Sequence, residues 1–282
     1  MAPNDALRWF DRPDLDHPTL VTAFKGWNDA GDAASTAAAF LAERWLLDDV
    51  AEIDPEEYFD FTETRPEVTL DHEGRRAITW PENRFRAGTV PGTGRDVVVL
   101  TGTEPQLRWR TFAAQVLEVA ETLGATRVVT LGALLTDIPH SRPTSVIGTC
   151  QDDDLLDYLG LQRSTYEGPT GIVGVLSDAS RAHGLQTVSL WGAVPSYVPG
   201  SPSPKAQLAL VERTARLLDV GVATTELEIA TAEYERQIDS LVEDDEDSVE
   251  YVEALERAYD ASDLDDDSDT LVDEVERFLR DR

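Results

Sequence analysis

Residues 24–35 read FKGWNDAGDAAS and join an apolar, strand-like run at residues 20–24 to an alanine-rich, helix-like run that ends near Leu47. Gly26 and Gly31 allow the connecting turn to adopt positive φ values or to approach a ligand closely. The first turn of a helix has unpaired backbone N–H groups and a partial positive charge, which together suit an anion. The stretch therefore predicts a strand, a turn and a helix that form a ligand-binding corner.

Strand-like and helix-like patterns alternate along the rest of the chain. The predicted strands lie at residues 20–24, 97–101, 127–131 and 188–191, and the predicted helices at residues 32–47, 107–123, 170–182 and 204–219. Between the first helix and the second strand, alternating runs at 58–61, 68–70 and 77–80 predict a β-rich insertion that extends the sheet with antiparallel strands. This order predicts an α/β fold with a mixed, mostly parallel sheet flanked by helices on both faces.

Acidic residues dominate the composition and gather near the C-terminus. The 282 residues have a net formal charge of −31, which argues against binding to nucleic acid or to an anionic membrane, because both need a positive protein surface. Residues 226–282 contain 23 acidic and 5 basic residues and so hold more than half of this excess. We therefore predict a sheet domain at residues 1–225 and an acidic helical C-terminal appendage at residues 226–282.

The appendage reads as helical at residues 222–242, 248–259 and 270–279, with an interrupted apolar stripe. Such a stripe must be buried somewhere, so we expect the appendage to pack on the sheet domain despite its charge. The stripe consists of Leu227, Ile229, Ile238, Leu241, Leu255, Tyr259, Leu271, Val275 and Phe278.

Several kinds of site and location are disfavoured by the sequence. The single cysteine, Cys150, excludes an intrachain disulfide and a cysteine-cluster metal site, and is expected to be a small buried residue. An acidic run at residues 263–269 imitates a calcium loop, but Ser268 stands where glycine is needed for the sharp turn. No apolar stretch approaches the length of a membrane span and no signal-peptide pattern is present, so a cytoplasmic location is expected.

Five unusual blocks occur in order between residues 24 and 205. They read FKGWNDAG at 24–31, GTEP at 102–105 followed by RWR at 108–110, GALLTDIPHSRP at 132–143, YEGPTG at 166–171, and VPSYVP at 194–199 running into PSPK at 202–205. These blocks resemble those of the proteasome assembly chaperone 2 family, in the long form found in actinobacteria. The resemblance implies a fold similar to the purine nucleoside phosphorylase-like α/β fold and a homo-oligomeric assembly, with a trimer favoured.

Three of the blocks directly follow predicted strands. We expect them to meet at the carboxyl ends of the parallel strands, where open α/β sheets bind ligands, and the equivalent rim of the implied fold holds phosphate and nucleoside. The candidate ligand-binding residues at this rim are Lys25, Gly26, Trp27, Asn28, Asp29, Gly31, Glu104, Arg108, Arg110, Asp137 and His140. Four more residues are expected to close the mouth of the pocket, namely Tyr166, Glu167, Tyr197 and Lys205.

Lys25 and Lys205 are the only lysines of the chain, and both lie within the blocks. Two readings of this pair remain open. Exposed lysines are often inert, and the pair would then be two unrelated surface residues. A compact ammonium group also donates well to an oxyanion, and the pair would then share a polar pocket with the other candidates.

The evidence for catalysis is weaker than the evidence for a pocket. Glu104 is expected to pair with Arg108 at a helix start rather than to orient a substrate, because an acid in the first turn suits the helix dipole. Asp137, His140 and Ser141 suggest a serine triad, but no Gly-x-Ser-x-Gly elbow occurs in the chain. We therefore assign no catalytic residue, no metal and no cofactor, and leave enzymatic activity open.

Two functions from different classes remain. The resemblance implies a chaperone-like protein that acts through protein–protein interaction, with proteasome subunits as the implied partners. The polar density of the blocks instead favours a small-molecule binding protein, or a phosphorylase- or hydrolase-like enzyme that acts on an anionic or nucleoside-like metabolite. In either case a homo-oligomer is expected to form through the sheet domain, because the like charges of the appendage disfavour self-contact.

Overall fold

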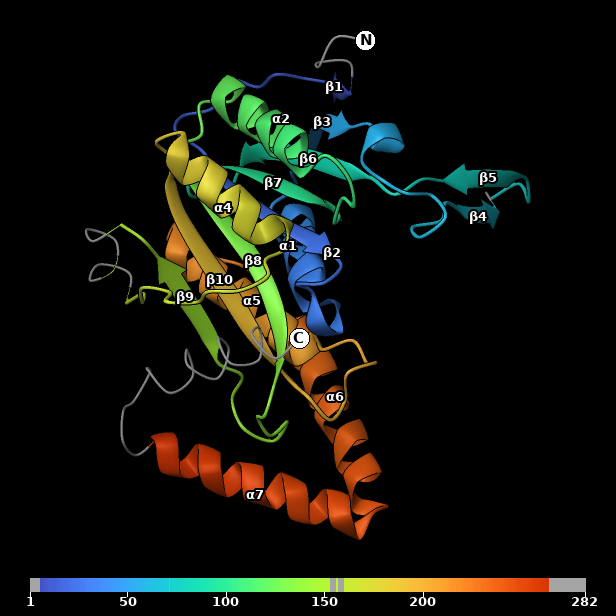
Figure 1. Cartoon of the computed structure of the whole chain (residues 1–282), viewed down its shortest axis with the longest axis vertical. Coiled ribbons are helices and arrows are strands. Elements are labelled where there is room, and N and C mark those ends of the chain that lie inside the picture. Colours follow the sequence, from blue (N-terminus) through green and yellow to red (C-terminus); the bar gives the residue numbers. More distant parts are fainter. Residues whose placement is uncertain (1–5, 71, 153–155, 157–159, 264–282) are drawn as a thin grey trace.

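The computed structural model describes residues 6–70, 72–152, 156 and 160–263. Its centre is an eight-stranded sheet with the strand order β1-β3-β6-β7-β2-β8-β10-β9, accompanied by a separate two-stranded sheet, β4-β5 (Figure 1). The strands are β1 Leu7–Trp9, β2 Thr19–Lys25, β3 Asp48–Ile53, β4 Glu67–Leu70, β5 Arg76–Thr79, β6 Asn83–Thr89, β7 Asp96–Thr103, β8 Arg127–Thr136, β9 Val146–Cys150 and β10 Gln186–Pro195.

The large sheet is mixed, as predicted, but it is not mostly parallel. Parallel pairing joins only the central strands β7, β2, β8 and β10. The flanking strands β6, β3, β1 and β9 pair antiparallel, which gives three parallel and four antiparallel pairings among the described strands of the large sheet. The prediction of a mostly parallel sheet failed mainly because the apolar patterns did not reveal β3 and β6. These strands carry charged side chains that pair with each other, Arg84 and Arg86 of β6 with Asp49 of β3.

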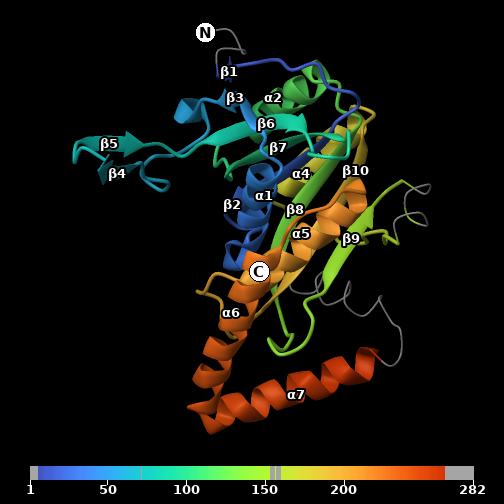
Figure 2. The same cartoon turned by 180° about the vertical axis from the view of Figure 1, so that it is seen from behind.

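Helices cover both faces of the sheet, as predicted. The helices on the two faces are α1 Ala33–Arg44, α2 Trp109–Thr122, α4 Ile172–Ala182 and α5 Pro204–Leu218, and α6 Thr225–Glu243 and α7 Glu246–Asp263 follow them. The alternation of β2 divides the core, because Val21 and Ala23 pack with α1 and α5 while Leu20 and Phe24 pack with α2 and α4. Figures 1 and 2 show these two helix pairs on opposite faces of the sheet.

The insertion after α1 extends the large sheet with antiparallel strands, as predicted, but it does so through β3 and β6, whereas the predicted hairpin, formed by β4 and β5, is a separate sheet. Every residue of both strands is exposed, and the hairpin projects from the body of the molecule (Figure 1). The strand predicted at 58–61 is wrong, since Pro55–Glu57 form a short 3-10 helix, η2, and a turn follows. Tyr58 is fully buried there and donates a hydrogen bond to Gln115 Oε1 at 2.8 Å.

The acidic helices α6 and α7 form an angled arm beyond α5 (Figure 2). Leu227 and Ile238 are buried as predicted, together with Tyr234 and Val252. Ile229 is instead 66% exposed, because it lies off the helix face that carries residues 227, 234 and 238. Leu241 lies on that face near the end of α6 and is 64% exposed. The helix expected at 270–279 and most of the calcium-like run lie outside the described residues. None of the helices in the described ranges is both long and apolar enough to span a membrane.

Candidate functional site

The corner at residues 24–35 folds as a strand, a tight turn and a helix, with the short 3-10 helix η1, Ala30–Asp32, between β2 and α1. The carboxylate of Asp29 accepts hydrogen bonds from the N–H groups of Ala34 and Ser35, at 2.8 and 3.1 Å, and from the Ser35 hydroxyl. Burial raises the pKa of Asp29, while these hydrogen bonds favour its charged form. The helix start that was predicted to receive an anion therefore binds the protein's own carboxylate.

Glu104 ties three of the sequence blocks together. One carboxylate oxygen accepts from the N–H of Trp27 at 3.1 Å, and the other accepts from the N–H of Ile172 at 2.8 Å. Gly26 and Gly171 leave the space for this approach, since an added Cβ would lie 2.8 Å from Glu104 Cβ and 2.7 Å from Glu104 Oε1, respectively. Glu104 thus fixes the turn after β2 to the start of α4.

The predicted pairing of Glu104 with Arg108 is therefore wrong. Arg108 lies at a positive φ of 56° before α2, and its guanidinium pairs with Glu57 of η2. Glu104 accepts hydrogen bonds from backbone N–H groups, whereas Glu57 is the charged partner of Arg108. The side chain of Arg108 is 55% exposed.

A second group of candidates surrounds His140, whose side chain is only 2% exposed. The Tyr197 hydroxyl lies 2.7 Å from both the backbone N and Nδ1 of His140, and Asp239 of α6 lies 2.9 Å from Nε2. Because the tyrosine oxygen accepts from the backbone N–H, its proton is directed to Nδ1, which leaves Nε2–H to donate to Asp239. Burial raises the pKa of Tyr197 to about 12, so the phenol stays protonated at neutral pH.

Lys205 completes this group by donating to the His140 carbonyl and to the carboxylate of Glu235 in α6. Its side chain is 12% exposed. Asp137 lies nearby, where it accepts from Ser196 at 2.7 Å and from Tyr251 of α7 at 3.3 Å. The structure therefore joins Asp137, His140, Tyr197 and Lys205 to the acidic helices.

The remaining candidates do not share one contact network. Lys25, Arg110 and Glu167 are exposed. Arg108 and Lys205 pair with carboxylates from different elements, η2 and α6.

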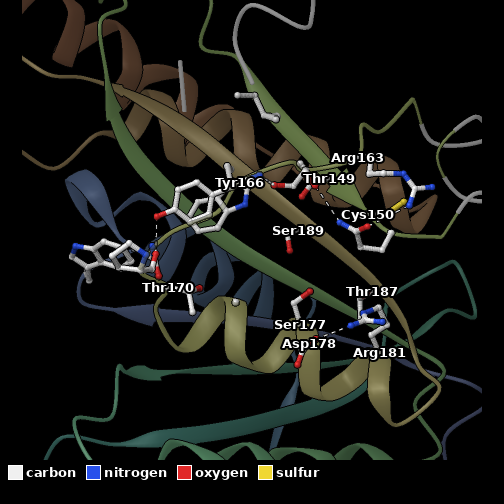
Figure 3. A pocket seen from close by; sticks show the side chains of 18 residues that line it. Thr149, Cys150, Arg163, Tyr166, Thr170, Ser177, Asp178, Arg181, Thr187 and Ser189 are labelled. Carbon is white, nitrogen blue, oxygen red and sulfur yellow. Dashed lines mark hydrogen bonds and ion pairs between the residues drawn. The ribbon is translucent and has the colours of Figure 1, made fainter. Parts of the chain in front are cut away.

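Two cavities flank Trp27. The larger, with a volume of about 650 Å³, lies between β9–β10 and α4 and includes the candidates Trp27, Asn28 and Tyr166 in its lining (Figure 3). The smaller, of about 380 Å³, lies against Gly26, Asp29 and Gly31.

Much of the larger cavity's lining was missed by the sequence reading. Thr187, Ser189 and Trp191 of β10 line it together with Ser177 and Arg181 of α4. The period-2 spacing of 187, 189 and 191 was an available signal, because alternate residues of a strand point to the same face. Cys150 also lines the cavity and is buried, as expected of a small core residue. Within the described residues, no three metal-ligating side chains form a cluster that would hold an ion.

Comparison with known proteins points to a single family. The model of the PAC2 family matches residues 23–242, a range that contains all five blocks. A PAC2 family protein from Streptomyces avermitilis is 47% identical, with a TM-score of 0.78, and the match covers 83% of this chain and 99% of that one. A Mycobacterium tuberculosis proteasome-assembly chaperone homologue is 43% identical, with a TM-score of 0.76 and the same coverages.

More distant structures share the fold. A Mycobacterium tuberculosis protein of unknown function is 30% identical with a TM-score of 0.85, and the match covers 98% of this chain and 96% of that one. The Pyrococcus furiosus archaeal proteasome activator is 18% identical with a TM-score of 0.69, over 83% of this chain and 97% of that one, and so shows likeness of fold alone. No curated protein matched the sequence.

Proposed function

Because the chain belongs to the PAC2 family, we propose that it is a chaperone-like protein that acts by binding proteasome subunits. The proposal rests on the similarity of this chain to the mycobacterial proteasome-assembly chaperone homologue, which extends over 99% of that relative. Such a role is expected in the cytoplasm, where subunits would meet the chaperone before they assemble.

The geometry of the strand-end rim favours binding over catalysis. Its acids and bases are occupied in holding the fold: Asp29 caps α1, Glu104 holds two backbone N–H groups, and His140 is enclosed by Tyr197 and Asp239. A general base has to reach a substrate proton, and a side chain that is 2% exposed, such as that of His140, has no direct access to one.

The β4–β5 hairpin supplies the apolar contact surface that a chaperone needs. Val68 pairs directly with Ile78, and Leu70 and Trp80 continue the same face at alternate positions. These four side chains are between 46% and 68% exposed, and Trp80 makes an edge contact with Phe61 at the hairpin base, 4.9 Å between ring centroids. A projecting apolar face of this kind is typical of a protein-binding site.

Three finer points belong to the same proposal. The fold is related to the purine nucleoside phosphorylase-like fold, the acidic helices from residue 226 act as a distinct appendage, and the protein forms a homo-oligomer through its sheet domain. The start of the appendage would coincide with α6, whose Leu227 packs into the main core. The appendage then remains attached by its first helix and offers its acidic surface to basic regions of a partner.

Binding to purified proteasome α-subunits tests the proposal. We expect the Val68→Thr and Ile78→Thr double variant to bind at least about tenfold more weakly than the wild type, because two apolar anchors lose their contact. A matched control changes Thr69→Ser and Thr79→Ser on the opposite face of the same hairpin and should bind normally. Absence of wild-type binding would refute the chaperone role, whereas equal binding by both variants would refute only the hairpin as its contact surface.

A further inference from the structure

The larger cavity has the dimensions of a small-molecule site and lies apart from the hairpin. Its volume of about 650 Å³ falls within the range of roughly 300–1,000 Å³ that is usual for ligand pockets. The floor is the face of β9 and β10, one wall is α4, and the segment around Tyr166 closes one end (Figure 3).

Three glycines from two of the sequence blocks give the cavity its shape. An added Cβ at Gly132 would clash with the ring of Trp191, one at Gly168 with the hydroxyl of Tyr166, and one at Gly171 with the amide of Asn28. None of these three glycines has a positive φ, so each is needed for space rather than for backbone conformation. Residues singled out in the sequence thus position the aromatic and amide groups of the cavity.

The end of the cavity near β2 is aromatic. Trp27, Tyr166 and Trp191 pack around the buried side chains of Leu134 and Ile147, and the Tyr166 hydroxyl is fixed by donating to the Pro169 carbonyl at 2.8 Å. Asn28 lies at the same end and is 5% exposed, and its side-chain oxygen has no hydrogen-bond partner within the described residues. A planar ring with a hydrogen-bond donor would suit these groups.

Hydroxyl groups follow along the floor and wall. Thr149, Thr187 and Ser189 line the sheet side, and Ser177 faces them from α4 (Figure 3). Thr130, which pairs with Ser189 from the neighbouring strand β8, donates to the Ser189 hydroxyl at 2.8 Å and so fixes its position. The middle of the cavity therefore offers several small polar contacts rather than an apolar surface.

The far end carries guanidinium groups from two segments, Arg163 and Arg181 (Figure 3). Arg181 pairs with Asp178 at 2.7 Å, but the two side chains are 56% and 74% exposed. An ion pair this exposed contributes little, about 0–1 kcal/mol, so Arg181 can exchange it for an anion of a ligand. Arg163 also contacts the amide oxygen of Gln151, at 3.4 Å.

We infer that this cavity binds a small anion that carries a planar ring, with the ring between Trp27, Tyr166 and Trp191 and a carboxylate or phosphate at Arg163 and Arg181. Such a ligand would add a binding activity to the proposed chaperone role, which does not require it. The net charge of −31 repels anions at long range, so the ring and the guanidinium groups are both needed for affinity.

Two pairs of probes separate the contributions of ring and charge. Adenosine 5′-monophosphate is compared with adenosine, and indole-3-acetate with indole-3-acetamide, by tryptophan fluorescence and by the melting temperature of the full chain. The two members of a pair share the ring, but only one of them carries the anionic group. The first pair tests a phosphate and the second tests a carboxylate. We expect at least one anion to bind about tenfold more tightly than its neutral partner and to raise the melting temperature.

Variants then locate the binding. Arg181→Gln should remove most of the preference for the anion, and Ser177→Leu should fill the cavity and abolish binding, while both unliganded variants melt as cooperatively as the wild type. Arg236→Gln is the matched control, because Arg236 also pairs with an acid three residues away on a helix but lies on α6. The inference is overturned if neither anion binds below about 10 mM, if anions and neutral partners bind equally, or if either cavity variant keeps wild-type affinity.

Discussion

At the scale of single residues, Asp29 shows how the unusual block at 24–31 contributes to the fold. The exposed Asp32 occupies the N-cap position of α1, yet its side chain makes no capping hydrogen bond. Asp29, three residues earlier, binds the N–H groups that a capping side chain would normally satisfy, those of Ala34 and Ser35. The block therefore acts as a displaced cap that fixes the turn relative to the helix.

Replacing this cap should lower stability in a graded way. Asp29→Ala leaves buried N–H groups without an acceptor and is expected to lower the free energy of unfolding by about 1–3 kcal/mol. Asp29→Asn keeps one side-chain oxygen as an acceptor and should lower the free energy of unfolding by less than half as much. Asp32→Asn is the control and should change stability by less than about 0.5 kcal/mol, since asparagine tolerates its φ of 52°. Urea unfolding measures all three, and an Asp29→Ala variant as stable as the wild type would contradict the capping role.

The candidate residues illustrate what sequence reasoning can identify. Three of the blocks meet at one end of the parallel strands, where the N–H of Glu104 donates to the Lys25 carbonyl and the N–H of Ala133 donates to the Asn28 carbonyl. The role of Glu104 was not predictable, because its second partner is the backbone N–H of Ile172, 68 residues away. Pattern reading identifies side chains that are chemically suited to a site, but it does not reveal which of them the fold will use for its own backbone.

At the scale of elements, α7 is attached to the body mainly through the loop after β8. Arg142 makes a two-pronged contact with Asp260, at 2.7 and 2.8 Å, and a longer one with Glu256 at 3.3 Å. The Tyr259 hydroxyl adds a hydrogen bond to the Pro143 carbonyl at 3.0 Å. The third sequence block therefore also serves as the docking site of the acidic arm.

Loss of the Arg142 contact should loosen α7 without affecting the sheet. In Arg142→Ala we expect amide hydrogen exchange across residues 246–263 to accelerate about fivefold, because a charge contact near the surface holds the helix only modestly. High salt should have a similar effect on the wild type. Arg257→Ala is the control, because Arg257 pairs with Glu253 within α7 itself. Equal exchange in wild type and Arg142→Ala would show that other contacts hold the arm.

The central elements could be predicted because their patterns are strong: β2, β7, β8 and the helices that follow them are apolar or clearly amphipathic. The strands β3 and β6 could not, since their exposed faces carry the charges of Asp49, Arg84 and Arg86 and their pairing is satisfied only across the sheet. The antiparallel extension of the sheet was therefore predicted, but from the wrong runs of the insertion.

At the scale of the whole molecule, the two acidic helices are attached to different degrees. Three residues of α6 are buried, Leu227, Tyr234 and Ile238, whereas Val252 is the buried member of α7 within the described range. Deleting residues 226–282 would remove several buried side chains of α6, whereas deleting residues 246–282 leaves α6 in place.

Truncation before Glu246 should therefore leave the remaining chain folded and its proposed oligomer intact. Truncation before Glu226 should lower the melting temperature, because each large buried side chain lost costs about 2–5 kcal/mol. Sedimentation velocity and thermal melting measure both effects. A monomer produced by the shorter deletion would place the self-association surface on α7 instead of the sheet domain.

The most direct test of the proposed function is to assemble proteasome particles from purified α and β subunits, with and without the full chain added. Native gel electrophoresis monitors the assembly. A chaperone-like role predicts that the chain forms a complex with unassembled subunits and raises the yield or the rate of particle formation. The Val68→Thr and Ile78→Thr double variant should do so less well. Unchanged assembly, together with no complex between the chain and either subunit, would contradict the account.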